Sequence, residues 1–209
     1  MRRFGKLLLT LVLIGCICSS VCTFITNANT GTDCTMGGII TEQTERFILD
    51  VFGCADSPEE LADLLLEFAL EHFTYDQNSI TIPQTADTNR FISKNNFHGV
   101  CMDFSAFVKS VFQVISRNKH WDHVGCHVVL GNDSPFREGH AVNYISVKNP
   151  DGTVTIYEFD VTRDLSRHRE GKSVQGIRYF FIVPSPEAVP QAIRNAFSQF
   201  YKYPYLIIT

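Results

Sequence analysis

The stretch HGVCMDFSAFVKSVF, residues 98–112, decides how the rest of the sequence is interpreted. Its apolar residues recur every three or four positions, which predicts an amphipathic helix with one buried face. That face comprises Phe104, Phe107, Val108, Val111, Phe112 and Ile115. Cys101 stands at the first turn of the predicted helix, just after Gly99 and Val100. Because the N-terminus of a helix has partial positive charge and unpaired N–H groups, it favours the nucleophilic thiolate. Cys101 is therefore a candidate nucleophile.

A predicted β-hairpin downstream carries a candidate base. The sequence NPDG, residues 149–152, is typical of a turn in which Pro150 presets φ and Gly152 adopts the left-handed conformation. The flanking residues 140–148 and 153–160 are rich in β-branched and aromatic side chains, which predicts two strands. A type I turn followed by a left-handed glycine closes a three-residue hairpin loop.

The register of this hairpin brings His140 close to Asp160. Pairing Asn149 with Thr153 places Val142 opposite Asp160. His140 and Asp160 are then diagonal neighbours on one face, roughly 7–8 Å apart at the backbone, within reach of a hydrogen bond between their side chains. A slip of one residue would send them to opposite faces.

Three segments in this order resemble the transglutaminase-like superfamily of papain-type cysteine enzymes. They are GVCMDFSAF around Cys101, HAVNYI from His140, and FDVT around Asp160. The resemblance covers about residues 57–163 and implies a papain/transglutaminase-like core. It also implies that Cys101 is the nucleophile, that His140 is the base and acid, and that Asp160 orients the imidazole.

The sequence departs from the family pattern at three positions. Met102 stands where the family often has Arg, Val142 where it often has Trp, and Val161 where it usually has Pro. These departures leave the catalytic groups in place. Because of them, the resemblance does not determine the class of substrate or the geometry of the oxyanion hole.

The predicted chemistry is acyl transfer without a metal or an organic cofactor. The Cys101 thiolate attacks an amide or ester carbonyl, and His140 passes the proton to the leaving group. The backbone N–H of Cys101 donates to the oxyanion, with Asn95 or Asn96 as candidates for the second donor. Further candidates for substrate contact are His98 and Glu158, although a surface histidine and a solvated carboxylate are ordinary alternatives.

This chemistry is compatible with more than one function. Water resolves the thioester in a peptidase or amidase acting on protein or cell-wall peptides, whereas an amine resolves it in a transamidase. A non-catalytic envelope binding module on the same fold is the alternative from another class.

Composition excludes some partners. The chain has 209 residues, 44% of them hydrophobic, which suits one domain with a sizeable core. Its net charge is −4 and it has no basic stripe, which argues against nucleic acid and leaves a protein or peptide substrate. The sequence HWDHVGCH contains metal-capable side chains at His120, His123, Cys126 and His127. They lack a second ligand pair, and alternation along a strand separates Cys126 from His127, so no metal site is predicted.

Residues 1–28 are predicted to be a signal peptide or an anchor segment. A basic start, MRRFGK, precedes the apolar residues 7–25. Cleavage after Ala28 would release the protein, a lipobox-like LIGC would put a lipid on Cys16, and an uncleaved segment would span a bilayer. All three alternatives imply export, to the cell envelope or the medium, and the position of LIGC slightly favours the lipid anchor. Residues 29–40 form a linker and residues 41–209 the domain.

The remaining pattern predicts an α+β fold with helices packed on one side of an antiparallel sheet. Helices are expected at residues 41–52, with Phe47, Ile48, Val51 and Phe52 inward, and from Pro58, where Ser57 and Glu60 form a capping box. Residues 76–96 are expected to be an irregular connection with a short strand at 80–82. Later elements are strands at 124–130 and 176–183 and a helix at 186–201, with Pro190 in its first turn or at a kink.

The seven cysteines leave the disulfide pairing open. Apart from Cys101 and the three in the N-terminal segment, they are Cys34, Cys54 and Cys126. An exported protein could join Cys34 to Cys54, and two free thiols are an equal alternative.

Overall fold

The computed structural model describes residues 39–76, 86–132, 139–200 and 203–208. The chain divides into two units, residues 1–34 and 35–209, and every described residue belongs to the second. The predictions for residues 1–28, Cys16, Cys34 and the short strand at 80–82 therefore lie outside the described residues. Among the described helices, none has the length and the hydropathy needed to cross a bilayer.

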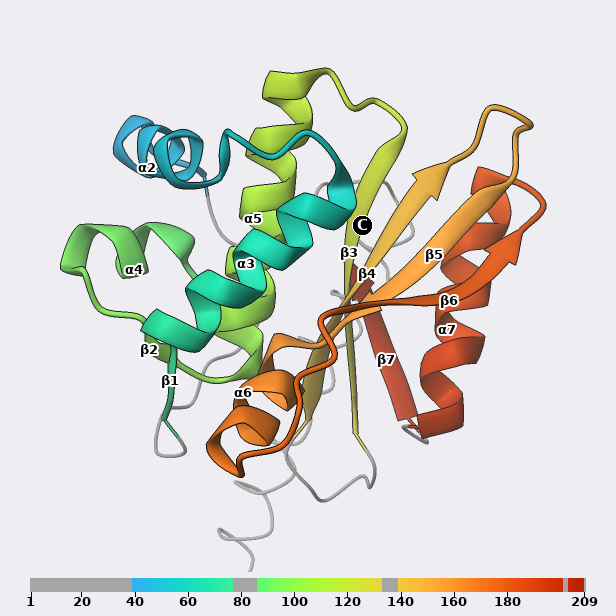
Figure 1. The fold of residues 1–209 in the computed structure, drawn as a ribbon. Coiled ribbons are helices and arrows are strands. Elements are labelled where there is room, and N and C mark those ends of the chain that lie inside the picture. Colours follow the sequence, from blue (N-terminus) through green and yellow to red (C-terminus); the bar gives the residue numbers. More distant parts are fainter. Residues whose placement is uncertain (1–38, 77–85, 133–138, 201–202, 209) are drawn as a thin grey trace, which may run out of the picture. The chain divides into compact units, whose positions relative to one another are not determined.

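The domain is α+β, as predicted, with a helical N-terminal part before the large sheet and two further helices among the later strands (Figure 1). The helices are α2 (Glu42–Phe52), α3 (Pro58–His72), α4 (Thr88–Lys94), α5 (Cys101–Lys119), α6 (Val161–Arg169) and α7 (Val189–Phe200), with a 3₁₀ turn η2 (Pro186–Ala188) before α7. Two short strands pair in parallel: β1 (Thr74–Tyr75) follows α3, and β2 (His98–Gly99) comes just before α5.

A five-stranded antiparallel sheet follows, in the order β6-β5-β4-β3-β7. Its strands are β3 (Val124–Asn132), β4 (His140–Lys148), β5 (Val154–Phe159), β6 (Ile177–Val183) and β7 (Tyr203–Ile208). The central hairpin, β4 and β5, turns as predicted: the Asn149 N–H donates to the carbonyl of Thr153 at 2.8 Å, and Gly152 has φ of +89°. Asn143 pairs with Phe159, which confirms the predicted register.

One hydrophobic cluster joins the N-terminal helices to one face of the sheet. Phenylalanine rings from α2, α3, α4 and α5 meet there, including Phe52, Phe68, Phe73, Phe91, Phe104 and Phe107. From the sheet side, Ile145 and Phe159 belong to the same cluster. The six residues predicted to form the buried face of α5 are all buried. Lys109 and Ser110 of α5 are buried as well: Lys109 lies near Cys126 and His127 of the sheet, and the Ser110 hydroxyl is 2.8 Å from that of Thr88 in α4.

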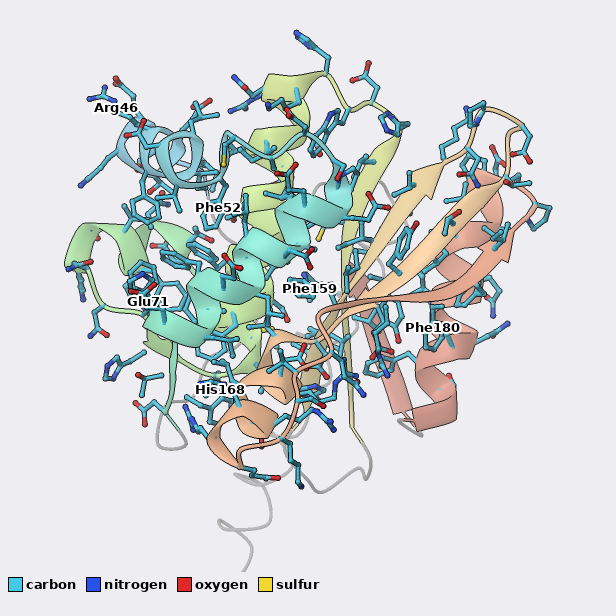
Figure 2. The ribbon with its side chains drawn as sticks, viewed as in Figure 1. Arg46, Phe52, Glu71, Phe159, His168 and Phe180 are labelled. Carbon is cyan, nitrogen blue, oxygen red and sulfur yellow. The ribbon has the colours of Figure 1, made fainter. Side chains whose placement is uncertain are left out.

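The other face of the sheet is covered by α7, so the prediction of helices on one side only is wrong. Val142 and Ile156 of the sheet pack there against Ile193 and Phe197 of α7. Figure 2 labels Phe52 and Phe159 in the cluster on the α5 side and Phe180 beside the cluster under α7. The sheet is therefore the middle layer of three.

Several local expectations need correction. Residues 76–96 are not wholly irregular, because Asp87 caps the helix α4 by accepting from the Asn89 N–H. Neither α6 nor β7 was predicted. Ser57 caps α3 as expected, but the Glu60 carboxylate accepts from the N–H of Asp56 rather than that of Ser57. Val51 is exposed, whereas its neighbours Ile48 and Phe52 are buried.

Candidate active site

The first turn of α5 is held by a buried carboxylate. Asp103 Oδ2 accepts from the backbone N–H of Val100 at 3.0 Å, and its Oδ1 accepts from Arg90 Nη2 at 3.2 Å. A Cβ at position 99 would lie 2.8 Å from the Asp103 side chain, so only glycine fits there without a shift. Gly99 and Asp103 thus fix the backbone on either side of Cys101.

The side chain of Cys101 lies against the start of β4. It is 6% exposed, and its S–H donates to the carbonyl of Gly139 over 3.7 Å. A second contact ties the helix to the same strand, because the buried Asn143 donates from Nδ2 to the carbonyl of Ser105 at 3.0 Å. Helix α5 and strand β4 are therefore joined at the point where the thiol and His140 meet.

His140 and Asp160 form the predicted hydrogen bond. The Nε2–H of His140 donates to Asp160 Oδ2 at 2.9 Å, which leaves Nδ1 as the ring nitrogen that can serve the thiol. Asp160 ends the hairpin and is the N-cap of α6, so its other oxygen, Oδ1, accepts from the Arg163 N–H at 3.0 Å. One buried carboxylate therefore orients the imidazole and starts a helix.

These contacts set the charge of the pair. Burial by itself lowers the pKa of His140, but hydrogen bonds and charges from Asp160 and Cys101 raise it to about 10. Burial raises the pKa of Asp160, but His140 and Arg163 lower it below its usual value. An imidazolium beside a carboxylate and a thiol is thus the favoured state at neutral pH.

A pocket of about 540 Å³ opens beside His140 and Asp160. Its wall includes Glu158, Arg163, Arg167 and Arg178. Glu158 is buried and not solvated: its Oε1 accepts from Arg163 Nη1 at 2.6 Å and also from Arg178 Nη2. The alternative of a solvated Glu158 is therefore wrong, and its contact with substrate stays a prediction.

The three upstream candidates lie elsewhere. Asn95 is the left-handed C-cap of α4 and lines a separate pocket formed with α2. Asn96 is exposed, and its Oδ1 accepts from the backbone N–H of His98 at 3.1 Å. The side chain of His98 is exposed on β2. None of the three lines the pocket that contains His140.

The cysteine and histidines of HWDHVGCH also have separate surroundings. Burial raises the pKa of Cys126 to about 12, so this thiol is neutral. Burial and the charge of Lys109 lower the pKa of His127 to about 4, and its Nε2 is 2.8 Å from the hydroxyl of Ser146. Within the part of the chain that the structure describes, no three His, Cys, Asp or Glu side chains are grouped to hold a metal ion.

Sequence reasoning missed the arginines of the pocket. Arg163 and Arg167 are four residues apart in VTRDLSRHR, a spacing that puts them on one face of a helix. That signal was present, but only the fold shows that this face meets β5 and β6 beside His140.

The chain was compared with protein families, curated proteins and solved structures, and it has a weak similarity to a solved structure. No protein-family model and no curated protein matches the chain. Among solved structures it is similar to one described as "a Putative Cysteine Protease from Cytophaga hutchinsonii", with a TM-score of 0.43 and 16% identity. The match covers 71% of this chain and 44% of the other, so this chain spans less than half of that protein's length. The chain resembles that fold only loosely.

Proposed function

We propose that this protein is an exported, transglutaminase-like cysteine hydrolase that cleaves amide bonds in protein or cell-wall peptides. The observation that supports it best is the meeting of three segments at His140. Its imidazole is hydrogen-bonded to Asp160, and its pKa is raised by both Asp160 and Cys101. In such an arrangement the imidazole can take the proton of the thiol, which produces a thiolate and an imidazolium side by side.

In the first half of the reaction the Cys101 thiolate attacks the carbonyl carbon of the scissile amide. The backbone N–H of Cys101, at the start of α5, donates to the oxyanion that forms. The His140 imidazolium then gives its proton to the leaving nitrogen, the C–N bond breaks, and an amine departs. The product is a thioester on Cys101 and a neutral imidazole.

The second half reverses the proton movement. The neutral His140 takes a proton from a water molecule, whose oxygen attacks the thioester. The C–S bond breaks, a carboxylic acid is released, and the thiolate and imidazolium are restored. Asp160 keeps the ring oriented in both halves without changing its own protonation.

Alkylation of the full chain by iodoacetamide between pH 5 and 10 tests the nucleophile. We expect Cys101 to react at its maximal rate already at neutral pH, whereas an ordinary thiol becomes reactive only around pH 8.5. Peptide mass spectrometry resolves Cys101 from the exposed Cys54 and the half-buried Cys126, which serve as controls within the same molecule.

Three outcomes distinguish a binding module, a hydrolase and a transamidase. A Cys101 rate that rises only around pH 8.5, unchanged in His140→Ala, indicates a binding module in place of an enzyme. Cleavage of a peptide library that is lost in Cys101→Ala supports the hydrolase. Incorporation of an added amine into a protein substrate, lost in the same variant, indicates a transamidase.

Export is a separate part of the proposal. It is supported by the basic and apolar residues of segment 1–28, with lipidation at Cys16 as the favoured form. Mass spectrometry of the mature N-terminus distinguishes an acylated Cys16 from cleavage after Ala28 and from an intact Met1. An intact Met1 on protein recovered from the cytoplasm would contradict export.

A further inference from the structure

The pocket beside His140 carries more positive charge than its own residues neutralise. Arg163 and Arg178 share the single carboxylate of Glu158. Arg167 has no carboxylate within ion-pair distance among the described residues, and its Nε–H donates to the carbonyl of Ser173 at 2.6 Å. The wall of the pocket thus contains three guanidiniums and two carboxylates, Glu158 and Asp160. The buried carboxylate of Asp164, outside the wall, also acts on Arg163, so Arg167 is the cation of the wall that is left without a carboxylate partner among the described residues.

The guanidiniums also have unused donors. Arg163 Nε and Nη2 and Arg178 Nε are buried without a hydrogen-bond partner. Arg167 Nη1 and Nη2 and Arg178 Nη1 have no partner among the described residues and are not buried. A guanidinium presents paired donors whose spacing matches the two oxygens of a carboxylate.

The position of the pocket separates it from the reacting bond. His140 and Asp160 line it but Cys101 does not. A group bound there lies beside the histidine–aspartate pair and not against the thiol. The polar side chains of Thr162, Ser166 and Gln175 complete the wall, and Val142 supplies an apolar surface.

We propose that this pocket is a subsite for a carboxylate group, held by the free edge of Arg167 together with Arg178. The single charge of Arg167, which no carboxylate pairs with among the described residues, suits a singly charged group. A phosphate dianion would meet stronger repulsion from Glu158 and Asp160. The identity of the ligand as an acidic residue of the peptide substrate rests on the proposed function, whereas carboxylate binding itself does not.

Binding is tested first, without catalysis, in full-length Cys101→Ala. Titration with N-acetylglutamate, followed by NMR of the arginine side chains, should show saturable binding with shifts at Arg167 and Arg178. Arg167→Gln should weaken it about tenfold, the loss expected when a charge-assisted pair worth about 1.4 kcal/mol is removed. Arg169→Gln removes the same charge from an exposed position on the same helix and should leave the affinity within about twofold.

Further variants and ligands sharpen this test. Arg167→Lys keeps the positive charge but lacks the paired N–H donors of a guanidinium, so this variant should bind N-acetylglutamate with intermediate affinity. Inorganic phosphate should bind more weakly than N-acetylglutamate. Absence of saturable binding, equal weakening by Arg167→Gln and Arg169→Gln, or tighter binding of phosphate would each overturn the subsite. An unchanged urea midpoint in Arg167→Gln verifies that this variant is folded.

The source of the carboxylate is tested with wild-type protein and pairs of peptides that differ only in Glu against Gln. Preferential cleavage of the Glu peptide through a lower KM, lost in Arg167→Gln, identifies an acidic residue of the substrate. Equal cleavage of both peptides, combined with binding of free N-acetylglutamate, would overturn the assignment to substrate and indicate a free carboxylate ligand. If no peptide is cleaved but the binding result holds, the proposed function fails and the subsite stands.

Discussion

At the scale of single residues, Asp160 performs two tasks with one carboxylate. Its Oδ2 accepts from His140 and its Oδ1 accepts from the N–H of Arg163 at the start of α6. A carboxylate held at both oxygens cannot rotate freely, so the imidazole that it orients is also fixed. The charge of Asp160 and its hydrogen bond stabilise the imidazolium of His140, which is why the pKa of that ring is raised despite its burial.

The first prediction concerns this pair. Asp160→Asn removes the charge that favours the imidazolium, so the pKa of His140 should fall from about 10 by more than one unit. NMR titration of the ring protons measures it, and Asp151→Asn, in the exposed hairpin turn, is the control. If the midpoint of His140 does not move, Asp160 does not determine its charge.

The pH dependence of activity follows from the same shift. The reactive form needs a protonated His140, so activity should decline on the alkaline side as the ring loses its proton near pH 10. Because Asp160→Asn lowers the pKa of His140, the alkaline decline should move to lower pH in that variant. A decline at the same pH in both proteins would mean that another group is responsible. Profiles of kcat/KM for one cleaved peptide provide the measurement.

At the scale of elements, the start of α5 determines where the thiol points. Val100 is the N-cap residue and cannot accept a hydrogen bond through its side chain, so the Asp103 carboxylate reaches back to the Val100 N–H instead. Arg90 from α4 binds the other oxygen of Asp103. The helix end is thereby fixed both to its own first turn and to a neighbouring helix.

Asp103→Ala should consequently affect both stability and reactivity. We expect a loss of about 1–3 kcal/mol in the free energy of unfolding, because a buried cap is lost and the Val100 N–H loses its acceptor. The alkylation rate of Cys101 at neutral pH should also fall. Ser57→Ala removes the cap of α3 and should cost about 1 kcal/mol without changing that rate. Urea denaturation and the alkylation assay separate the two effects, and equal rates in both variants would contradict a positioning role for Asp103.

At the scale of the whole domain, the site depends on one layer of helices and the sheet, while the opposite layer supports the sheet from behind. Helix α5 is enclosed between the sheet and α2–α4, and α7 covers the far face. Ile193 of α7 is fully buried against the sheet. The α7 layer therefore contributes stability without touching Cys101.

Substitutions in α7 test whether this layer affects stability and leaves the reactivity of Cys101 unchanged. Ile193→Ala should lower the free energy of unfolding by about 2–4 kcal/mol through the cavity it leaves. Arg194→Ala, exposed on the same helix, should change it by less than about 0.5 kcal/mol. Under native conditions the alkylation of Cys101 should be the same in both variants. A slower reaction in Ile193→Ala would show that the layers are coupled.

Local patterns were sufficient for much of the arrangement. The period of the apolar residues predicted α5 and its buried face, and the NPDG turn predicted the register that brings His140 to Asp160. Both depend on interactions between residues close in sequence, where side-chain spacing and turn geometry leave few alternatives. The three-residue loop fixes the alignment of β4 and β5, and that alignment alone puts both side chains on one face.

Tertiary structure decided the features made by segments far apart in the chain. The second helical layer requires α7 to pack on the sheet. The grouping of Arg163 and Arg167 with Arg178, and the burial of Glu158 beside Arg163 and Arg178, require α6, β5 and β6 to meet. Helical spacing showed which arginines share a face, but it carries no information on which strand that face will contact. The sequence by itself determined a cysteine at a helix start and a histidine paired with an aspartate across a hairpin. Only packing decided what surrounds them, because the charge and volume of a pocket depend on partners that no local pattern specifies.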